Sequence, residues 1–410
     1  MGLWAFFTVV TTLFESIKSN LLKNAHIKFV GNRKEEKTAV ASSSLLLNAT
    51  LNILFILFLL FFSGKISYWI GAGKELEHML RLFIPGMLFL IFFSHLEAVA
   101  QSHLDFKAVF AGNFARQATF FLIILVQAVC KVPFSLDYIV VYLSISLLIG
   151  TTVLFLYSRK HLLFVFNPSL KWIKELVSFG GYIFGIGILV NIFGNLDQLM
   201  IARFTSKTSM VANYNSASRI STMISIPSYA AADILLPKVS QIDLTKGLDQ
   251  VKYMYERMVG VLLSFTTPVA LVIFLFPKFV ITMIAGARYQ DAAFIVQMYM
   301  LSAMVLPIQN QAANILLYIG KARLCFLLNL LFLGINFGLN YLCFTEFGPY
   351  GAAIGNVIGC TLGTIVWYLV LRKSVNIEYN NILRYAGNSY KVIYSKAMSL
   401  RRLNQASTIV

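Results

Sequence analysis

Long apolar runs separated by short polar segments dominate the chain. A membrane-spanning helix needs about 20 mostly apolar residues to cross about 30 Å of hydrocarbon. Eleven runs satisfy this requirement: 1–22, 45–63, 80–104, 109–130, 138–157, 174–201, 211–236, 258–276, 291–319, 324–344 and 350–371. Membrane β-strands alternate over about ten residues, so these long continuous runs exclude a barrel. The pattern predicts an all-α polytopic membrane protein with about eleven transmembrane helices.

The polar segments indicate how the chain is divided. We expect an N-terminal helix bundle at 1–157, a cytoplasmic linker at 158–173, a C-terminal six-helix bundle at 174–371 and a basic cytoplasmic tail at 372–410. Five runs precede the linker and six follow it, and the chain opens directly in an apolar run. We therefore expect that the first helix of a six-plus-six design is missing upstream of Met1.

Two segments resemble each other, which predicts an internal repeat. Residues 97–108 (EAVAQSHLDFKA) align with residues 311–322 (QAANILLYIGKA) at an offset of 214. In both, a polar stretch with a small Ala ends one apolar run, and Lys-Ala opens the next. Internal repeats are typical of transporters, whose substrate site lies between the halves. The alternative is chance similarity between two apolar helices.

Composition agrees with a bilayer as the main solvent. Of 410 residues, 58% are hydrophobic and 12% are charged, whereas about 25% are charged in soluble domains. These values exclude a soluble enzyme, a coiled coil, a disordered protein and a disulfide scaffold. The four cysteines lack CxxC spacing, so we expect small buried hydrophobes and no metal site.

The basic residues set the orientation. The chain carries 34 Lys and Arg against 17 Asp and Glu, a net charge of +17. They lie between apolar runs and not on one hydrated face, which disfavours a nucleic-acid partner. Alternate loops carry 24 and 8 of them, so the positive-inside rule predicts a cytoplasmic carboxyl end and an outer amino end. Basic loops also attract anionic membrane lipids.

Ionisable residues inside the first and third runs are candidate functional groups, because a charge at the bilayer centre costs about 2.5–3.5 kcal/mol on insertion scales. Glu15 and Lys18 share a helix face. They pair with each other, or Lys18 snorkels to the interface or holds an anionic substrate. His95 and Glu97 lie in the most polar stretch of the third run. Glu97 is either a proton-relay carboxylate or a hydrogen-bonded structural one.

Two more charges lie further along the chain. Asp197 is placed either at a transport site or in water at the outer interface. The helix before it is made thin and bendable by Gly180, Gly181, Gly185 and Gly187. Arg219 keeps its charge and needs a carboxylate, a phosphate or a wet cavity. We expect it to face a cavity, and pairing with Asp197 or Glu97 is the alternative.

Four prolines lie inside predicted helices, where a missing N–H and a ring clash produce kinks. These candidate hinges are Pro85, Pro227, Pro268 and Pro307. Catalytic motifs are absent: the sequence has no HExxH and no GxxxxGK[ST], and its loops are short. We expect no enzyme and no ATPase, and any energy must come from an ion gradient or from the gradient of the substrate.

Several segments resemble the polysaccharide flippase family. They are 185–203 (GIGILVNIFGNLDQLMIAR), 211–220 (VANYNSASRI), 235–240 (LLPKVS), 320–323 (GKAR) and 347–355 (FGPYGAAIG). Relatives include O-antigen (Wzx-like), teichoic-acid and lipid II flippases and multidrug extruders of the multidrug/oligosaccharidyl-lipid/polysaccharide exporter (MOP) superfamily. The resemblance covers nearly the whole chain and starts at what looks like the second helix of the family.

The resemblance implies two six-helix lobes in a V around a cavity that opens alternately to each side. Such a protein moves an undecaprenyl-pyrophosphate-linked oligosaccharide, such as an O-antigen or capsule repeat, to the outer leaflet of the bacterial cytoplasmic membrane. Candidate pyrophosphate-holding cations are Lys18, Lys107, Arg116 and Arg219. Candidate coupling or gating groups for a proton or sodium ion are Glu15, His95, Glu97 and Asp197.

The implied partners are membrane lipids and the glycan polymerase and glycosyltransferases of the same pathway, and no cofactor is expected. Two alternatives remain. A cation-coupled multidrug extruder would need an acidic cavity, and Asp and Glu are scarce. A membrane glycan polymerase or ligase would need a large outer loop, and the predicted outer loops are short.

Overall fold

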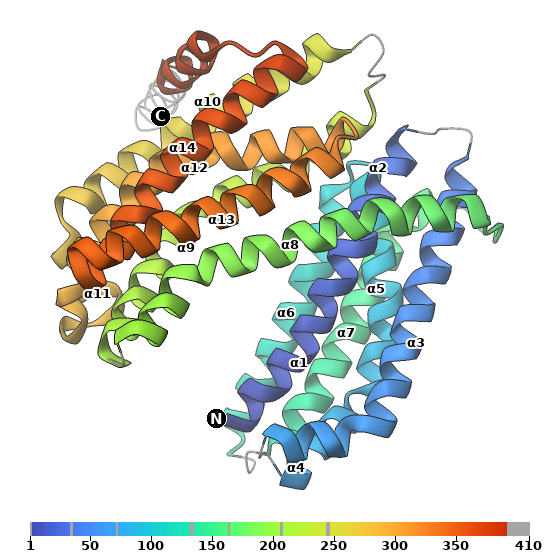
Figure 1. Cartoon of the computed structure of the whole chain (residues 1–410). Coiled ribbons are helices and arrows are strands. Elements are labelled where there is room, and N and C mark those ends of the chain that lie inside the picture. The colour runs from blue at the N-terminus through green and yellow to red at the C-terminus, as the bar shows by residue number, and fades with distance from the viewer. Residues whose placement is uncertain are drawn as a thin grey trace, which may run out of the picture. The chain divides into compact units, whose positions relative to one another are not determined.

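The computed structural model describes residues 2–32, 36–70, 73–131, 135–162, 165–205, 208–242 and 247–391. Within these ranges the chain is almost entirely helical and has no strand (Figure 1). Nine of the described segments are long and apolar enough to cross a membrane, and the longest, 322–375, contains two helices. The prediction of an all-α polytopic membrane protein is confirmed.

The chain divides into two compact units, Met1–Phe184 (unit 1) and Gly185–Val410 (unit 2). The boundary lies inside α8 (Leu170–Thr205) and not in the predicted linker 158–173. The reason is that α8 is one continuous helix of 36 residues, about 54 Å long at 1.5 Å per residue. Its two ends therefore contribute to different units.

Unit 1 consists of α1 and α2 joined by a π-helical turn, followed by five further helices and a short 3₁₀ turn. Their bounds are α1 Gly2–Lys18, η1 Ser19–Lys23, α2 Asn24–Asn32, α3 Lys37–Ile70, α4 Gly73–Leu82, α5 Ile84–Ser102, α6 Phe106–Val129, α7 Leu136–Ser158 and η2 Arg159–His161. A buried apolar cluster that includes Phe7, Leu59, Leu80 and Val140 joins α1, α3, α4 and α7. The core therefore lies between helices far apart in sequence.

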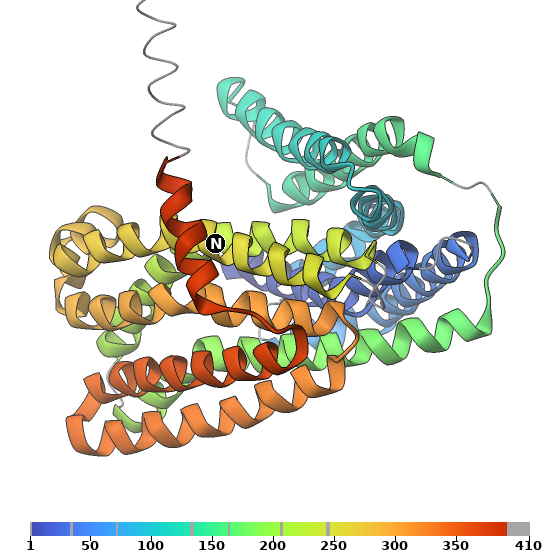
Figure 2. The same ribbon diagram turned by 90° about the horizontal axis from the view of Figure 1, so that it is seen from above.

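Unit 2 begins with the second part of α8, the first of its long helices, and a short helix follows the third of them. Its elements are α9 Thr208–Ser240, α10 Leu248–Leu275, α11 Pro277–Ala285, η3 Ala287–Ala292, α12 Ala293–Tyr318, α13 Ala322–Phe347, η4 Gly348–Tyr350 and α14 Gly351–Val375. Residues 379–391, in the predicted tail, form a further helix that crosses α10 (Figures 1 and 2). The Tyr390 hydroxyl of this helix donates a hydrogen bond to the Ser264 carbonyl of α10, which joins the two helices.

Some local predictions need correction. Pro85 occupies the first turn of α5, after a break that follows Leu82. A proline there replaces an N–H that has no helical partner, so it starts a helix and kinks none. Pro227, Pro268 and Pro307 do lie inside helices.

The cysteine prediction also holds only in part. Cys325 and Cys360 are buried as expected, and Cys343 is half-buried. Cys130 is exposed, because it caps the end of α6 outside the packed interior. Neighbouring apolar residues therefore did not predict its burial.

The helix turns at α5–α6 and α12–α13 share one hydrogen-bond pattern. The N–H groups of residues 103, 104 and 105 donate to the carbonyls of 99, 101 and 100, and those of 319, 320 and 321 donate to 315, 317 and 316. Each turn has a left-handed residue at the same place, Leu104 with φ 60° and Gly320 with φ 92°. Equivalent positions are thus 216 residues apart, and the predicted offset of 214 is wrong by two. The Lys-Ala pairs at 107–108 and 321–322 therefore stand at different positions relative to the two turns.

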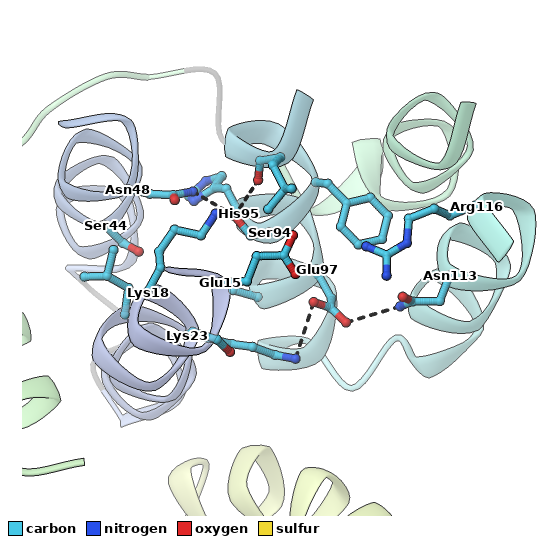
Figure 3. Close-up of a pocket in the computed structure, with 15 residues that line it drawn as sticks. Glu15, Lys18, Lys23, Ser44, Asn48, Ser94, His95, Glu97, Asn113 and Arg116 are labelled. Carbon is cyan, nitrogen blue, oxygen red and sulfur yellow. Dashed lines mark hydrogen bonds and ion pairs between the residues drawn. The ribbon is translucent and has the colours of Figure 1, made fainter. Parts of the chain in front are cut away.

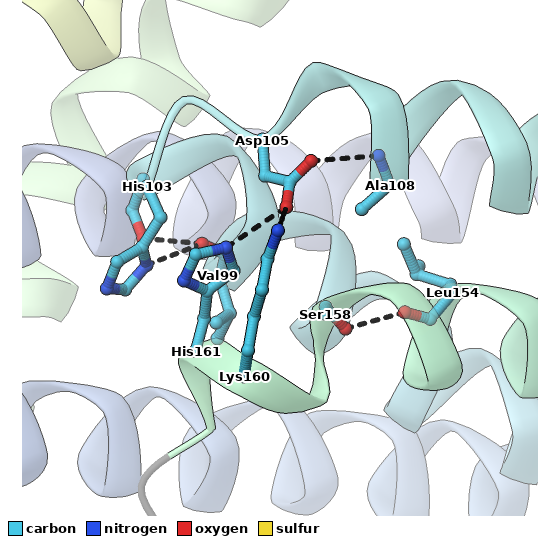
Figure 4. A network of polar contacts seen from close by, with 9 residues as sticks. Val99, His103, Asp105, Ala108, Leu154, Ser158, Lys160 and His161 are labelled. Carbon is cyan, nitrogen blue, oxygen red and sulfur yellow. Dashed lines mark hydrogen bonds and ion pairs between the residues drawn. The ribbon is translucent and has the colours of Figure 1, made fainter.

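Polar contacts close the α5–α6 turn against the end of α7 (Figure 4). Asp105 Oδ1 accepts the Ala108 N–H at 3.2 Å, which caps α6. Its Oδ2 lies 2.8 Å from Lys160 Nζ and 3.0 Å from His161 Nε2. Burial alone would raise the pKa of Asp105, but these hydrogen bonds outweigh it and lower the pKa to about 2. Asp105 is therefore ionised at any physiological pH.

A close helix contact explains one of the glycines before Asp197. A Cβ at Gly180 of α8 would overlap the backbone carbonyl of Leu21 in η1, whereas a Cβ at Gly181 would meet no atom within 4 Å. We expect Gly180→Ala to destabilise the protein by about 1–3 kcal/mol, because α8 and η1 must separate. Unfolding of the detergent-solubilised protein measures the loss, with Gly181→Ala as the matched control. Equal stability of the two variants would contradict the contact.

Candidate functional site

Five elements of unit 1, namely α1, η1, α3, α5 and α6, enclose a polar cavity of about 250 Å³ (Figure 3). Five predicted site residues line it from different helices: Glu15, Lys18, His95, Glu97 and Arg116. The other lining residues are Ser19, Leu22, Lys23, Ser44, Asn48, Leu90, Phe93, Ser94, Ala98 and Asn113. We call this space the unit 1 cavity.

Lys18 is a buried charge in the unit 1 cavity. Its side chain is 3% exposed, and its Nζ has no hydrogen-bond partner among the described residues. The ring of Phe14, centred 5.9 Å away, gives a weak cation–π contact. The predictions that Lys18 snorkels or pairs with Glu15 are wrong: it is buried, and no ion pair joins these two within the described residues. A buried ammonium without a partner is costly, so the cavity needs water or an anion beside it.

Glu97 is already partnered. Its Oε2 lies 3.4 Å from Lys23 Nζ, and its Oε1 accepts a hydrogen bond of 3.2 Å from Asn113 Nδ2. Glu15, by contrast, lies at the junction of the unit 1 cavity with a second space of about 160 Å³. Arg116 lines both spaces as well.

Arg116 and His95 complete the lining. Arg116 is the eleventh residue of α6 and therefore lies well inside the helix. Its guanidinium lies 5.0 Å from the centre of the Phe93 ring. The Nδ1 of His95 is buried without a partner, and its ring meets that of His26 edge to face at 5.5 Å. Both side chains therefore present polar atoms to a confined space.

Sequence reasoning missed the polar wall that α3 contributes. Ser44, Asn48 and Asn52 recur every four residues, which places them on one helix face. Asn48 Nδ2 donates to the Ile91 carbonyl at 2.8 Å and to Ser94 Oγ at 3.0 Å, and so joins α3 to α5. The repeated spacing is visible in the sequence, but neutral polar residues stand out less in an apolar run than charged ones do.

Two predicted cations, Lys107 and Arg219, are not among the residues that line this cavity. Lys107 is exposed in the first turn of α6. Arg219 is exposed on α9, where its Nε donates to Asn215 Oδ1 at 3.0 Å. Within unit 2 the Asp197 carboxylate is held by Tyr299, Asn340 and Asn356 and not by Arg219, so the predicted alternative that pairs these two is wrong. The pairing of Arg219 with Glu97 of unit 1 stays a prediction.

Asp197 is buried inside unit 2, so the prediction that it lies in water at the outer interface is wrong. Only 3% of it is exposed. Its carboxylate accepts hydrogen bonds from Tyr299 Oη at 2.7 Å, Asn340 Nδ2 at 2.6 Å and Asn356 Nδ2 at 3.2 Å. Three neutral donors stabilise the charge, and no basic side chain is among these partners. Among the described residues, no group of three or more His, Cys, Asp or Glu could hold a metal ion.

Comparison with known proteins places this geometry in context. A family model described as "Polysaccharide biosynthesis protein" matches residues 1–294. The uncharacterized membrane protein MJ1068 of Methanocaldococcus jannaschii is 30% identical over 207 residues, which is 49% of this chain and 40% of that relative. The chain thus matches about two fifths of the length of this curated relative.

Solved structures share the fold over nearly the whole chain. The Vibrio cholerae MATE transporter VcmN in its bent form has a TM-score of 0.74 and 14% identity, covering 93% of this chain and 89% of that one. A MOP superfamily transporter from Pyrococcus furiosus, whose binding pocket is described as having reverse polarity, has a TM-score of 0.72 and 17% identity. That match covers 91% of this chain and 87% of the other.

Proposed function

Because the chain belongs to the polysaccharide biosynthesis protein family and has the fold of MOP superfamily transporters, we propose that it is a flippase for lipid-linked oligosaccharides. It would move an undecaprenyl-pyrophosphate-linked repeat unit from the cytoplasmic to the outer leaflet by alternating access. We assign it to the bacterial cytoplasmic membrane with the carboxyl end inside. The observation that carries the proposal is the buried, unpartnered ammonium of Lys18 in the unit 1 cavity.

The charges of the unit 1 cavity suit a diphosphate. Lys18, Lys23 and Arg116 face Glu15 and Glu97, and the pair Lys23–Glu97 neutralises itself. Lys18 and Arg116 therefore outnumber Glu15. A diphosphate cannot cross hydrocarbon unless its negative charge is compensated. Charge-assisted hydrogen bonds from basic side chains in a hydrated cavity stabilise it. The lipid tail can remain in the bilayer while the head group enters.

Ion coupling is part of the proposal. Glu15 and Glu97 lie in the same cavity as the proposed anion-binding groups, so a proton there would alter the charge that the substrate meets. Asp197 is a second candidate in unit 2, where its oxygens could release or bind a proton or a sodium ion. His95 and the hinges Pro227, Pro268 and Pro307 are proposed gating residues. Arg219 and Lys107 remain proposed phosphate contacts along the path.

A cation-coupled multidrug extruder is the second candidate, favoured by the likeness in fold to a MATE transporter. That likeness concerns the fold alone at 14% identity. A cationic drug would require an acidic cavity, and the unit 1 cavity has more basic than acidic side chains. Transport of an anionic lipid head group is therefore the better fit.

Loss of the gene in its host tests the proposal. We expect lipid-linked repeat units to accumulate on the cytoplasmic leaflet, the side on which the glycosyltransferases act. Surface glycan, which the polymerase makes from flipped units, should disappear. Protection of the lipid-linked sugar from an added, membrane-impermeant glycosidase measures the leaflet. Unchanged surface glycan together with increased dye sensitivity would instead support the extruder.

A further inference from the structure

A second polar cavity, of about 380 Å³, lies within unit 2 between α8, α9, α12, α13 and α14. We call it the unit 2 cavity. Its volume falls within the range of small-molecule sites, about 300–1,000 Å³. Thirteen of its 20 lining residues carry an amide or a hydroxyl group, and none is Asp, Glu, Lys, Arg or His. It is therefore hydrophilic and formally uncharged, unlike the unit 1 cavity.

Six amide groups line the wall. They are Asn191, Asn195, Gln309, Asn310, Asn329 and Asn356. An amide presents one acceptor oxygen and two N–H donors at fixed angles. The Oε1 atom of Gln309 is buried and has no hydrogen-bond partner in the described part of the chain, so the cavity contains one acceptor that a ligand donor can use.

The face of α9 adds hydroxyl groups at helical spacing. Ser218, Ser221, Thr222 and Ser225 line the cavity from successive turns. Tyr229, one turn further, is 56% exposed and offers a ring face. Amides and hydroxyls that both donate and accept, next to an aromatic face, match a ligand with many hydroxyl groups and an apolar C–H face.

Other ligands fit this wall less well. Asp197 lies directly behind it, because Tyr299 and Asn356, which both line the cavity, donate to its carboxylate. A negative charge in that place disfavours a diphosphate. An apolar drug would give the Gln309 Oε1 atom no donor and would cover hydroxyl and amide groups that it cannot hydrogen-bond, which is costly.

We propose that the unit 2 cavity binds uncharged sugar residues of the transported glycan. This inference rests on the proposed function and deepens it. The diphosphate and the sugars would then be held by separate sites, the first by cations in unit 1 and the second by neutral amides and hydroxyls in unit 2. Transport would select its substrate by sugar structure as well as by charge.

Direct binding to the purified full-length protein in lipid nanodiscs tests the site. The probes are the oligosaccharide released by mild acid from the lipid-linked pool of the host, and inorganic pyrophosphate. We expect Gln309→Leu and Asn329→Leu each to weaken oligosaccharide binding at least tenfold and to leave pyrophosphate binding unchanged. Gln309→Leu removes an unpartnered buried oxygen, so the variant should fold.

The matched control is Gln250→Leu, an exposed amide in the first turn of α10, which should bind both probes as the wild type does. Equal oligosaccharide affinity in wild type and both cavity variants would overturn the inference, as would no binding to the wild type. Those results leave the flippase proposal standing, since the leaflet assay decides it separately. Absence of lipid-linked sugar accumulation in the deletion strain would instead remove the proposed function.

Discussion

Replacing Lys18 by methionine is expected to make the protein more stable and nearly inactive. The buried ammonium has no partner, so an apolar side chain of similar length removes its desolvation cost, worth about 1–4 kcal/mol. The same change removes a cation proposed to hold the diphosphate. A charged hydrogen bond contributes about 1.5–3 kcal/mol, so transport should fall at least tenfold. Chemical unfolding and flipping of lipid-linked oligosaccharide in proteoliposomes measure the two effects.

Lys278→Met is the matched control for this prediction. Lys278 is exposed in the first turn of α11 and is not among the residues that line the unit 1 cavity. Its loss should change stability by less than about 0.5 kcal/mol, as is usual for surface substitutions. Full transport by Lys18→Met would show that the ammonium does not serve the substrate. Reduced stability of that variant would show that Lys18 has a partner after all.

Replacing Asp197 is expected to separate folding from ion coupling. Asp197→Ala leaves Tyr299, Asn340 and Asn356 without their acceptor, and each unsatisfied buried donor costs about 1–3 kcal/mol. We expect a loss of about 3–5 kcal/mol in the free energy of unfolding. Asp197→Asn keeps the shape and one acceptor oxygen, so it should fold and yet lose transport driven by a proton or sodium gradient.

Transport into proteoliposomes with and without an imposed gradient measures the second effect. The control is Asp249→Asn, an exposed carboxylate in the first turn of α10. If transport by the Asp197→Asn variant responds to the gradient as transport by the wild type does, Asp197 is excluded from coupling. The stability of Asp197→Ala is independent of that result, because it tests only the hydrogen bonds.

Hydropathy predicted the helices well because the bilayer imposes a minimum length on every span. It could not place their ends. The run at 80–104, read as one span, contains the break between α4 and α5 beside Pro85. Polar contacts such as Asp105 with Lys160 depend on helices that meet only in the folded protein.

The sequence predicted the charged residues of the candidate site but not its neutral polar residues. Glu15, Lys18, His95, Glu97 and Arg116 do meet in one cavity, because charges in apolar runs are rare enough to stand out. Serine and asparagine are common, so the stripe on α3 and the wall of the unit 2 cavity carried no comparable signal. Their spacing along each helix was the available clue.

Unequal backbone strain distinguishes the two matching helix turns. Gly320 adopts the left-handed conformation freely, whereas Leu104 does so at a cost of about 1–2 kcal/mol. The α5–α6 turn therefore depends more on the ion pairs of Asp105. Because the pKa of Asp105 is lowered to about 2, this support is complete above about pH 4, the ordinary range of an aspartate, and disappears as the pH falls through 2. Strong acid should thus disrupt the α5–α6 turn of unit 1 before it disrupts the α12–α13 turn of unit 2.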